Sequence, residues 1–126
     1  LSGDQLVSSL AIKLGADRII MGIDVDGLYS ADPKVDPSAR LIPHLTPQEL
    51  KHLQQKIEEA QVTDVTGGML GKILELMPAV AQGVKAIIVN ASKPNYIYRV
   101  LKGERVPGTI IEARENIAQP NRKEKV

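Results

Sequence analysis

Residues 18–27 read RIIMGIDVDG, and residues 85–92 read KAIIVNAS. Each stretch opens with a short apolar run rich in β-branched side chains and passes directly into polar residues. Such runs are typical of strands buried on both faces of a sheet. We therefore predict strands over residues 18–23 and 85–90. Because ligands of open α/β sheets bind beyond the carboxyl ends of the strands, the residues that follow each run are candidates for a binding site.

A helix is predicted before the first of these strands, over residues 3–14. Its apolar residues recur at the spacing of an amphipathic helix. They are Leu6, Val7, Leu10, Ala11 and Leu14. Asp4 lies in the first turn, where the helix dipole favours a carboxylate, and Gly15 is expected to end the helix.

Residues 24–48 contain four of the eight prolines and are predicted to be loop, with a small hairpin between residues 28–30 and 40–42. Thr46 is a suitable N-cap for a helix over residues 47–60, with Pro47 at its first position and Glu49 at its third. The pattern thus predicts a sharply defined start for this helix.

The rest of the chain alternates between helical and extended patterns. A helix is predicted from the glycine-rich segment at 62–72 to Gly83, with Pro78 breaking or kinking it. A short helix to about residue 101 and a strand over 108–112 follow. The element order predicts an α/β fold, a three-layer α/β/α sandwich with a mainly parallel sheet. We assign residues 1–114 to the folded domain and residues 115–126 to a polar tail.

Composition excludes several classes of function. Lys and Arg number 16 and Asp and Glu 15, so the net charge of +1 argues against a dedicated nucleic-acid binder. No apolar run is long enough for a transmembrane helix, and we expect neither a membrane nor a nucleic-acid partner. The sequence contains no cysteine, so these residues form no disulfide and no zinc–thiolate site. With no signal-peptide pattern, we expect a cytoplasmic location.

Two short acidic segments are candidates for ligand contact. In Ser2-Gly3-Asp4, glycine lets the backbone approach a phosphate at the positive end of a helix. The alternative interpretation is that Asp4 is an ordinary first-turn acid. Asp24 follows the first predicted strand in the sequence Asp-Val-Asp-Gly, where it could bond a nucleotide or orient a lysine. The alternative there is a plain turn, since Asp and Gly are common turn residues.

The segment TDVTGGMLGK at residues 63–72 carries the sharpest local signal. Gly67 and Gly68 precede a predicted helix, and Lys72 lies one turn into it. Backbone N–H groups, a helix N-terminus and a cation together suit a polyphosphate. The spacing is not that of a P-loop. The alternative interpretation is a loop with a solvated lysine.

Asn90 and the residues up to Pro94 follow the second strand, where they could contact an adenine or a ribose or form a plain connection. His44 and His52 are too isolated in the sequence to suggest a metal site, and we expect them to have structural roles.

Four segments, in this order, resemble the carboxyl-terminal, nucleotide-binding half of the amino acid kinase superfamily, and within it the archaeal isopentenyl phosphate kinases. They are SGD at 2–4, GADRIIMGIDVDGLY at 15–29, TDVTGGMLGK at 63–72 and NASKPNYIYRVLKGERVPGTII at 90–111. The resemblance extends from residue 1 to about residue 112. It implies transfer of the γ-phosphoryl group of ATP to isopentenyl phosphate, giving isopentenyl diphosphate, with Mg²⁺ accompanying the nucleotide.

The resemblance also implies roles for individual residues. Gly3 would approach the substrate phosphate, and Asp4 would position phosphate-binding lysines. Asp24 and Tyr29 would line the nucleotide site, which Gly67 and Gly68 would also contact. Lys72 would neutralise the charge that builds up on the transferring phosphoryl group.

The amino-terminal half of that family has no counterpart here, including its first-strand lysine, its glycine-rich phosphate loop and its substrate-binding histidine. The chain also begins at Leu1, directly before the predicted helix, which we interpret as a sign of a longer protein. We expect this chain to bind nucleotide weakly at most, not to turn over alone, and to take as partners the missing amino-terminal half or a second copy in a homodimer.

Other functions remain open at this point. The segment ADPKVDPSA at 31–39 resembles uridylate kinases, and fosfomycin-resistance kinases share the TGGM loop. A different class of function, a non-catalytic nucleotide-binding or oligomerisation module, also fits an isolated half-domain.

Overall fold

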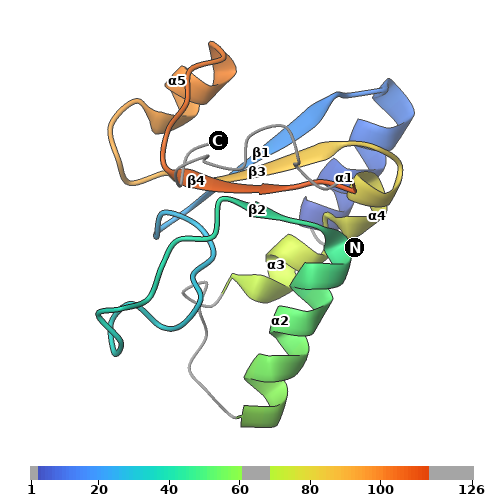
Figure 1. The fold of residues 1–126 in the computed structure, drawn as a ribbon. Coiled ribbons are helices and arrows are strands. Elements are labelled where there is room, and N and C mark those ends of the chain that lie inside the picture. Colours follow the sequence, from blue (N-terminus) through green and yellow to red (C-terminus); the bar gives the residue numbers. More distant parts are fainter. Residues whose placement is uncertain (1–2, 61–68, 114–126) are drawn as a thin grey trace.

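The computed structural model describes residues 3–60 and 69–113, which form helices around one open sheet (Figure 1). The helices are α1 (Gly3–Leu14), α2 (Pro47–Ala60), α3 (Leu70–Leu74), α4 (Met77–Ala81) and α5 (Tyr96–Leu101). The strands are β1 (Arg18–Ile23), β2 (His44–Leu45), β3 (Lys85–Asn90) and β4 (Gly108–Ile111). Within these ranges, no helix has the length and hydrophobicity needed to cross a bilayer.

The sheet has the strand order β1-β3-β4-β2. The β1–β3 and β2–β4 pairs are parallel and the β3–β4 pair is antiparallel, which confirms an α/β fold with a mainly parallel sheet. In the parallel pair Arg18 lies opposite Lys85, and Ile23 lies opposite Asn90. The two predicted binding loops therefore leave the sheet side by side at one edge.

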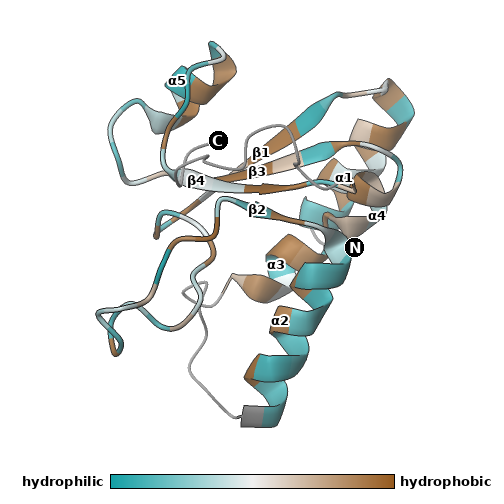
Figure 2. Cartoon of the chain, in the orientation of Figure 1, coloured by the Kyte–Doolittle hydropathy of each residue, from teal (hydrophilic) through white to brown (hydrophobic). Residues whose placement is uncertain are grey.

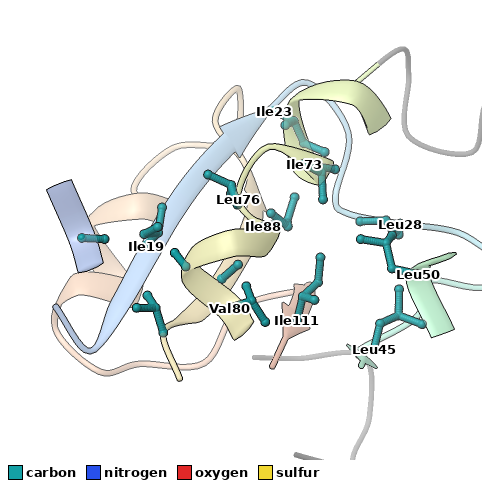
Figure 3. Packing of buried hydrophobic residues seen from close by; sticks show 14 residues of the cluster. Ile19, Ile23, Leu28, Leu45, Leu50, Ile73, Leu76, Val80, Ile88 and Ile111 are labelled. Atoms are coloured by element: carbon teal, nitrogen blue, oxygen red, sulfur yellow. The ribbon is translucent and has the colours of Figure 1, made fainter. Parts of the chain in front are cut away.

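Alternate side chains of β3 enter two separate hydrophobic clusters. Ala86 and Ile88 belong to the larger cluster, to which α1, α2, α3 and α4 contribute (Figure 3). Ile87 and Val89 belong to a smaller cluster that includes Val100 of α5. Figure 1 shows α5 on the opposite side of the sheet from α3 and α4. The period-two alternation of a strand explains how one apolar run serves both clusters.

The prediction that both apolar runs are buried on both faces is confirmed for β3 and wrong for β1. Every residue of β3 after Lys85 is buried. In β1, Ile19 and Ile23 are buried, while Gly22 is exposed. The reason is position: in the part of the chain that the structure describes, β1 is an edge strand that pairs only with β3.

Helix α1 has an apolar stripe that the described residues leave largely exposed. Leu6, Val7, Leu10 and Leu14 are 46%, 45%, 45% and 78% exposed. Only Ala11 of the predicted apolar positions is buried. The helix is held instead by its small residues, because the buried Ser8 hydroxyl accepts a hydrogen bond from the Ala79 backbone N–H at 3.2 Å.

The predicted start of α2 is confirmed by a reciprocal pair of hydrogen bonds. The Glu49 N–H donates to Thr46 Oγ1 at 3.2 Å, and the Thr46 N–H donates to Glu49 Oε1 at 3.0 Å. The two bonds form a capping box. Figure 2 shows hydrophilic colour over most of the visible side of α2, as expected for a helix with one exposed face.

The helix predicted across Pro78 is broken, as expected, into α3 and α4. The break falls at residues 75–76, and Pro78 lies in the first turn of α4, where its missing N–H has no cost. At the end of α1, Gly15 adopts a φ of +66°, and the Ala16 N–H bonds to the Ala11 carbonyl at 2.9 Å, which confirms the predicted stop.

The hairpin predicted over residues 28–42 is reduced to one antiparallel bridge between Tyr29 and Leu41. The Ser30 N–H donates to the Arg40 carbonyl at 2.9 Å beside it. Strand β2 was not predicted, because two residues are too few to show a periodic pattern. The predicted tail at 115–126 lies outside the described residues.

Candidate functional site

The first turn of α1 and the short helix α3 meet near the carboxyl end of β1. Lys72 Nζ of α3 lies 3.7 Å from Asp4 Oδ2 of α1. The residue after Lys72, Ile73, belongs to the same core cluster as Ile23, the last residue of β1, and the two lie next to one another in Figure 3. The fold therefore brings two of the predicted site residues, far apart in sequence, to the edge where ligands of α/β sheets bind.

The Asp4–Lys72 pair contributes little to stability but places a cation beside the first turn of α1. The Lys72 side chain is 58% exposed and the Asp4 side chain 25% exposed. An ion pair at such a separation in contact with water contributes about 0–1 kcal/mol. The pair nevertheless brings the Lys72 ammonium group close to the N-terminus of α1. A movable cation beside an open surface is well suited to an anionic ligand.

Gly3 stands directly before Asp4, and the packing of the described residues does not explain why it is glycine. A Cβ at Gly3 would meet nothing within 4 Å, and the same is true of Gly71 beside Lys72. Both positions are exposed. They leave the backbone open to an approaching group. Gly67 and Gly68, the other predicted nucleotide contacts, lie outside the described residues.

The loop after β1 divides into an exposed acid and a buried turn. Asp24 is exposed. Gly27 is buried, and a Cβ on it would lie 2.5 Å from Thr109 Oγ1. That hydroxyl accepts a hydrogen bond from the Leu28 N–H at 3.0 Å and donates one to the Ile42 carbonyl at 2.6 Å. The interpretation of this segment as a plain turn therefore holds for Gly27. Asp24 is exposed and lies outside the packing around Thr109.

Tyr29 is half-buried and lies two residues beyond this turn, where it forms the bridge to Leu41. The bridge ties the predicted nucleotide-contacting tyrosine to the second arm of the residue 28–42 loop. This bridge is part of the fold of the loop itself.

The loop after β3 is tied to the loop after β1 by a side chain whose role the sequence did not reveal. Asn90 is only 5% exposed, and its Nδ2 donates to Asp26 Oδ1 at 3.1 Å. Its Oδ1 accepts hydrogen bonds from the Ser92 N–H at 2.9 Å and from the Ser92 hydroxyl. The signal in the sequence is a polar amide directly after the apolar run at residues 86–89.

The two histidines have no metal-ligand neighbourhood among residues 3–60 and 69–113, where no group of three His, Cys, Asp or Glu side chains could hold an ion. His44 Nε2 lies 2.9 Å from Glu112 Oε1, and Lys85 Nζ lies 3.8 Å from Glu112 Oε2. These residues stand at the starts of β2 and β3 and after the end of β4. The cluster therefore joins strands at one end of the sheet, and Asn90 lies at the other end of β3.

Both aspartates of the loop at residues 31–39 accept hydrogen bonds from residues of the same loop. Asp32 Oδ1 accepts a hydrogen bond from the Lys34 N–H at 2.9 Å. Asp36 Oδ1 accepts bonds from the Ser38 hydroxyl at 2.6 Å and the Ser38 N–H at 2.9 Å. The hydroxyl first and the N–H second hold the pKa of Asp36 below its ordinary value. Each aspartate thus closes its own turn.

The arrangement as a whole, a mainly parallel open sheet with a lysine–aspartate pair at its carboxyl edge, defines a candidate phosphate-binding site. A model of the amino acid kinase family matches residues 1–90. The chain belongs to the amino acid kinase family.

Curated relatives include kinases of three kinds. The chain is 44% identical over 112 residues to isopentenyl phosphate kinase of Methanothermobacter thermautotrophicus, covering 88% of this chain and 41% of that protein. It is 37% identical over 110 residues to glutamate 5-kinase of Synechocystis sp., covering 87% of this chain and 29% of that protein. It is 34% identical over 113 residues to uridylate kinase of Methanocella arvoryzae, covering 86% and 46%.

Among solved structures, the fold matches an isopentenyl phosphate kinase with a TM-score of 0.63 and 38% identity, covering 88% of this chain and 36% of that chain. The chain thus spans less than half the length of each of these relatives. The resemblance to the amino acid kinase superfamily and to isopentenyl phosphate kinase is confirmed.

Proposed function

We propose that this chain supplies the nucleotide-binding half of an ATP-dependent kinase that phosphorylates isopentenyl phosphate. The observation that carries the proposal is the meeting of Asp4 and Lys72 at the carboxyl edge of the sheet. The acceptor is chosen because identity to isopentenyl phosphate kinase, at 44%, exceeds identity to the glutamate and uridylate kinases, at 37% and 34%.

In the proposed reaction, an oxygen of the isopentenyl phosphate group attacks the γ-phosphorus of ATP, and ADP leaves. Phosphoryl transfer relies on positioning and charge stabilisation. Lys72 would neutralise charge on the transferring phosphoryl group, and Asp4 would orient Lys72. Gly3 leaves room for a phosphate to approach the first turn of α1, whose partial positive charge favours an anion.

The loops after β1 and β3 would receive the nucleotide. Asp24 is exposed at the carboxyl end of β1, and Tyr29 lies beyond the turn held by Gly27 and Thr109. Mg²⁺, when bound with ATP, would shield the charge of the phosphates. Since the described residues contain no cluster able to hold a metal ion by themselves, we place the ion chiefly on the nucleotide phosphates.

The chain would act with a partner that completes the fold. The apolar stripe of α1 and the open edge of β1 are both uncovered among the described residues, and large apolar patches and open edges favour association. The relatives contain a further stretch of protein more than half their length. We propose that such an amino-terminal half covers this surface, with a homodimer of this chain as the alternative occupant.

The first test is binding of ATP in the presence of MgCl₂ to this chain, measured by isothermal titration calorimetry. Lys72→Ala should weaken binding by at least about tenfold, the equivalent of one charge-assisted hydrogen bond. Lys56→Ala, which removes an exposed lysine from α2, is the matched control and should bind as the parent does. Equal binding by all three proteins, with unchanged circular dichroism, would contradict the proposed role of Lys72.

The second test supplies the amino-terminal portion of the Methanothermobacter isopentenyl phosphate kinase as a separate chain. We expect no turnover by this chain alone, and turnover of isopentenyl phosphate when both are present. Turnover by this chain alone would refute the half-site proposal. A preference for UMP or glutamate over isopentenyl phosphate would replace the proposed acceptor.

A further inference from the structure

Asn90 ends β3 at the point where the two candidate nucleotide loops leave the sheet. It is paired in register with Ile23, the last residue of the neighbouring parallel strand. The loop that begins at Asp24 and the loop that begins at Ala91 therefore start side by side. The Ala91 N–H donates to the Ile23 carbonyl at 2.7 Å, which joins the loops at their base.

The Asn90 side chain joins the same loops further out, and both ends of its amide are used. Nδ2 donates to Asp26 in the loop after β1. Oδ1 accepts two hydrogen bonds from Ser92, in the loop after β3. A buried amide with partners on both sides is held in one orientation, because any other orientation would leave a polar atom unsatisfied.

This contact gives the two acids of the segment Asp24-Val25-Asp26 different roles. Asp26 is half-buried and accepts the Asn90 amide, so its carboxylate is engaged within the protein. Asp24 is exposed at the same edge. The sequence selected Asp24 from its place directly after the strand, and the structure adds that Asp26 is an anchoring acid.

We propose that Asn90 is a positioning residue that, through Asp26, fixes the spacing between the residue 24–27 loop and the residue 91–95 loop around a bound nucleotide. The inference deepens the proposed function and rests on it for the identity of the ligand. The tie between Asn90 and Asp26 exists without the ligand, so it can be tested separately.

The test is a four-member cycle built on the direction of the hydrogen bond. Asn90→Asp keeps the acceptor for Ser92 but removes the donor and sets two carboxylates against each other. Asp26→Asn keeps the bond, because the amide oxygen of asparagine can still accept it. The double variant restores a bond with donor and acceptor exchanged. Asn95→Asp, at an exposed residue of the same loop with no side-chain cap bond, is the control for added charge.

Two measurements are made on the full chain: amide hydrogen exchange of residues 24–30 and 91–96 without ligand, and ATP binding with MgCl₂. We expect Asn90→Asp alone to accelerate exchange in both loops and to weaken ATP binding by at least about tenfold. Asp26→Asn, the double variant and Asn95→Asp should stay within about threefold of the parent, close to the usual error of additivity.

Slow exchange in Asn90→Asp would overturn the inference, and so would a double variant that exchanges as fast as Asn90→Asp. Loss of ATP binding in both proteins that carry the Asp26→Asn substitution, with slow exchange retained, would show that the Asp26 charge itself is required and would also overturn it. If Asn90→Asp fails to fold, the double variant and Asp26→Asn still decide the outcome. If the parent binds no ATP while the exchange pattern holds, the proposed function fails and the coupling of the loops stands.

Discussion

Strands β1 and β3 are parallel neighbours with similar sequences, yet they have different surroundings. Their registers run together from Arg18 opposite Lys85 to Ile23 opposite Asn90. After its first residue β3 is buried throughout, whereas β1 exposes Gly22 and leaves Ile20 half-buried. The difference follows from pairing: β3 lies between β1 and β4, and β1 has one neighbour in the described sheet.

An apolar run in the sequence indicates that a strand is suited to burial. The neighbours of the strand in the fold decide how much of its surface is buried. Helix α1 gives the same lesson, since its predicted apolar stripe is largely exposed among the described residues. The two uncovered features are consistent with our proposal that a further part of the kinase fold covers this side.

The largest expected effect compares one isoleucine on each strand. Ile88→Ala removes a fully buried side chain from β3 and should lower the free energy of unfolding by about 2–5 kcal/mol. Ile20→Ala removes a half-buried side chain from β1 and should cost about 1 kcal/mol, because it buries less apolar surface. Urea unfolding followed by circular dichroism measures both values.

Equal losses for the two variants would break the comparison, because they would mean that β1 is as buried in solution as β3. Addition of an amino-terminal half should change the cost of the β1 variant alone. If that half covers β1, the cost of Ile20→Ala rises toward that of Ile88→Ala, while the cost of the latter stays unchanged.

Much of the fold was predictable because it is written in local patterns. The capping box of Thr46 and Glu49, the stop at Gly15 and the break near Pro78 each depend on residues a few positions apart. Strand β2 was not predictable, since its two residues pair with β4 far along the chain. The exposure of β1 depends likewise on what lies beside it in space, which no local pattern contains.

The candidate site divides in the same way. Asp4 and Lys72 could be selected one by one from their motifs, because each lies beside a glycine near a helix start, where backbone N–H groups suit a phosphate. Their 3.7 Å separation is a property of the fold. The link from Asn90 to Asp26 crosses between two loops, so the sequence showed a polar residue ending an apolar strand but not its partner.

A smaller effect is expected from filling the gap between β1 and the loop after β3. A Cβ on Gly22 would lie 2.7 Å from the Ala91 Cβ, whereas its register partner on β3, Val89, has room for a full side chain. Gly22→Ala should destabilise the protein by about 1–3 kcal/mol through overpacking.

The matched control for this variant is Gly71→Ala, where an added Cβ meets nothing within 4 Å. Because Gly71 lies in a helix, alanine there should be neutral or stabilise by up to about 1 kcal/mol. Urea midpoints of the two variants decide the question, and a Gly22→Ala protein as stable as the parent would show that the Ala91 loop can yield.

The smallest effect distinguishes the first residues of the two strands. The Arg18 guanidinium donates from Nη1 to the Val100 carbonyl at 3.1 Å and from Nη2 to the Leu101 carbonyl at 3.2 Å, so it caps the end of α5. Lys85 opposite it makes a 3.8 Å ion pair with Glu112, and the Lys85 side chain is 45% exposed.

We expect Arg18→Ala to lose about 1 kcal/mol and Lys85→Ala less than about 0.5 kcal/mol. Faster amide exchange at residues 99–104 in Arg18→Ala alone would tie the loss to α5. An equal loss in Lys85→Ala would instead show that the charge at the start of each strand, and not the fork to α5, is what stabilises this end of the sheet.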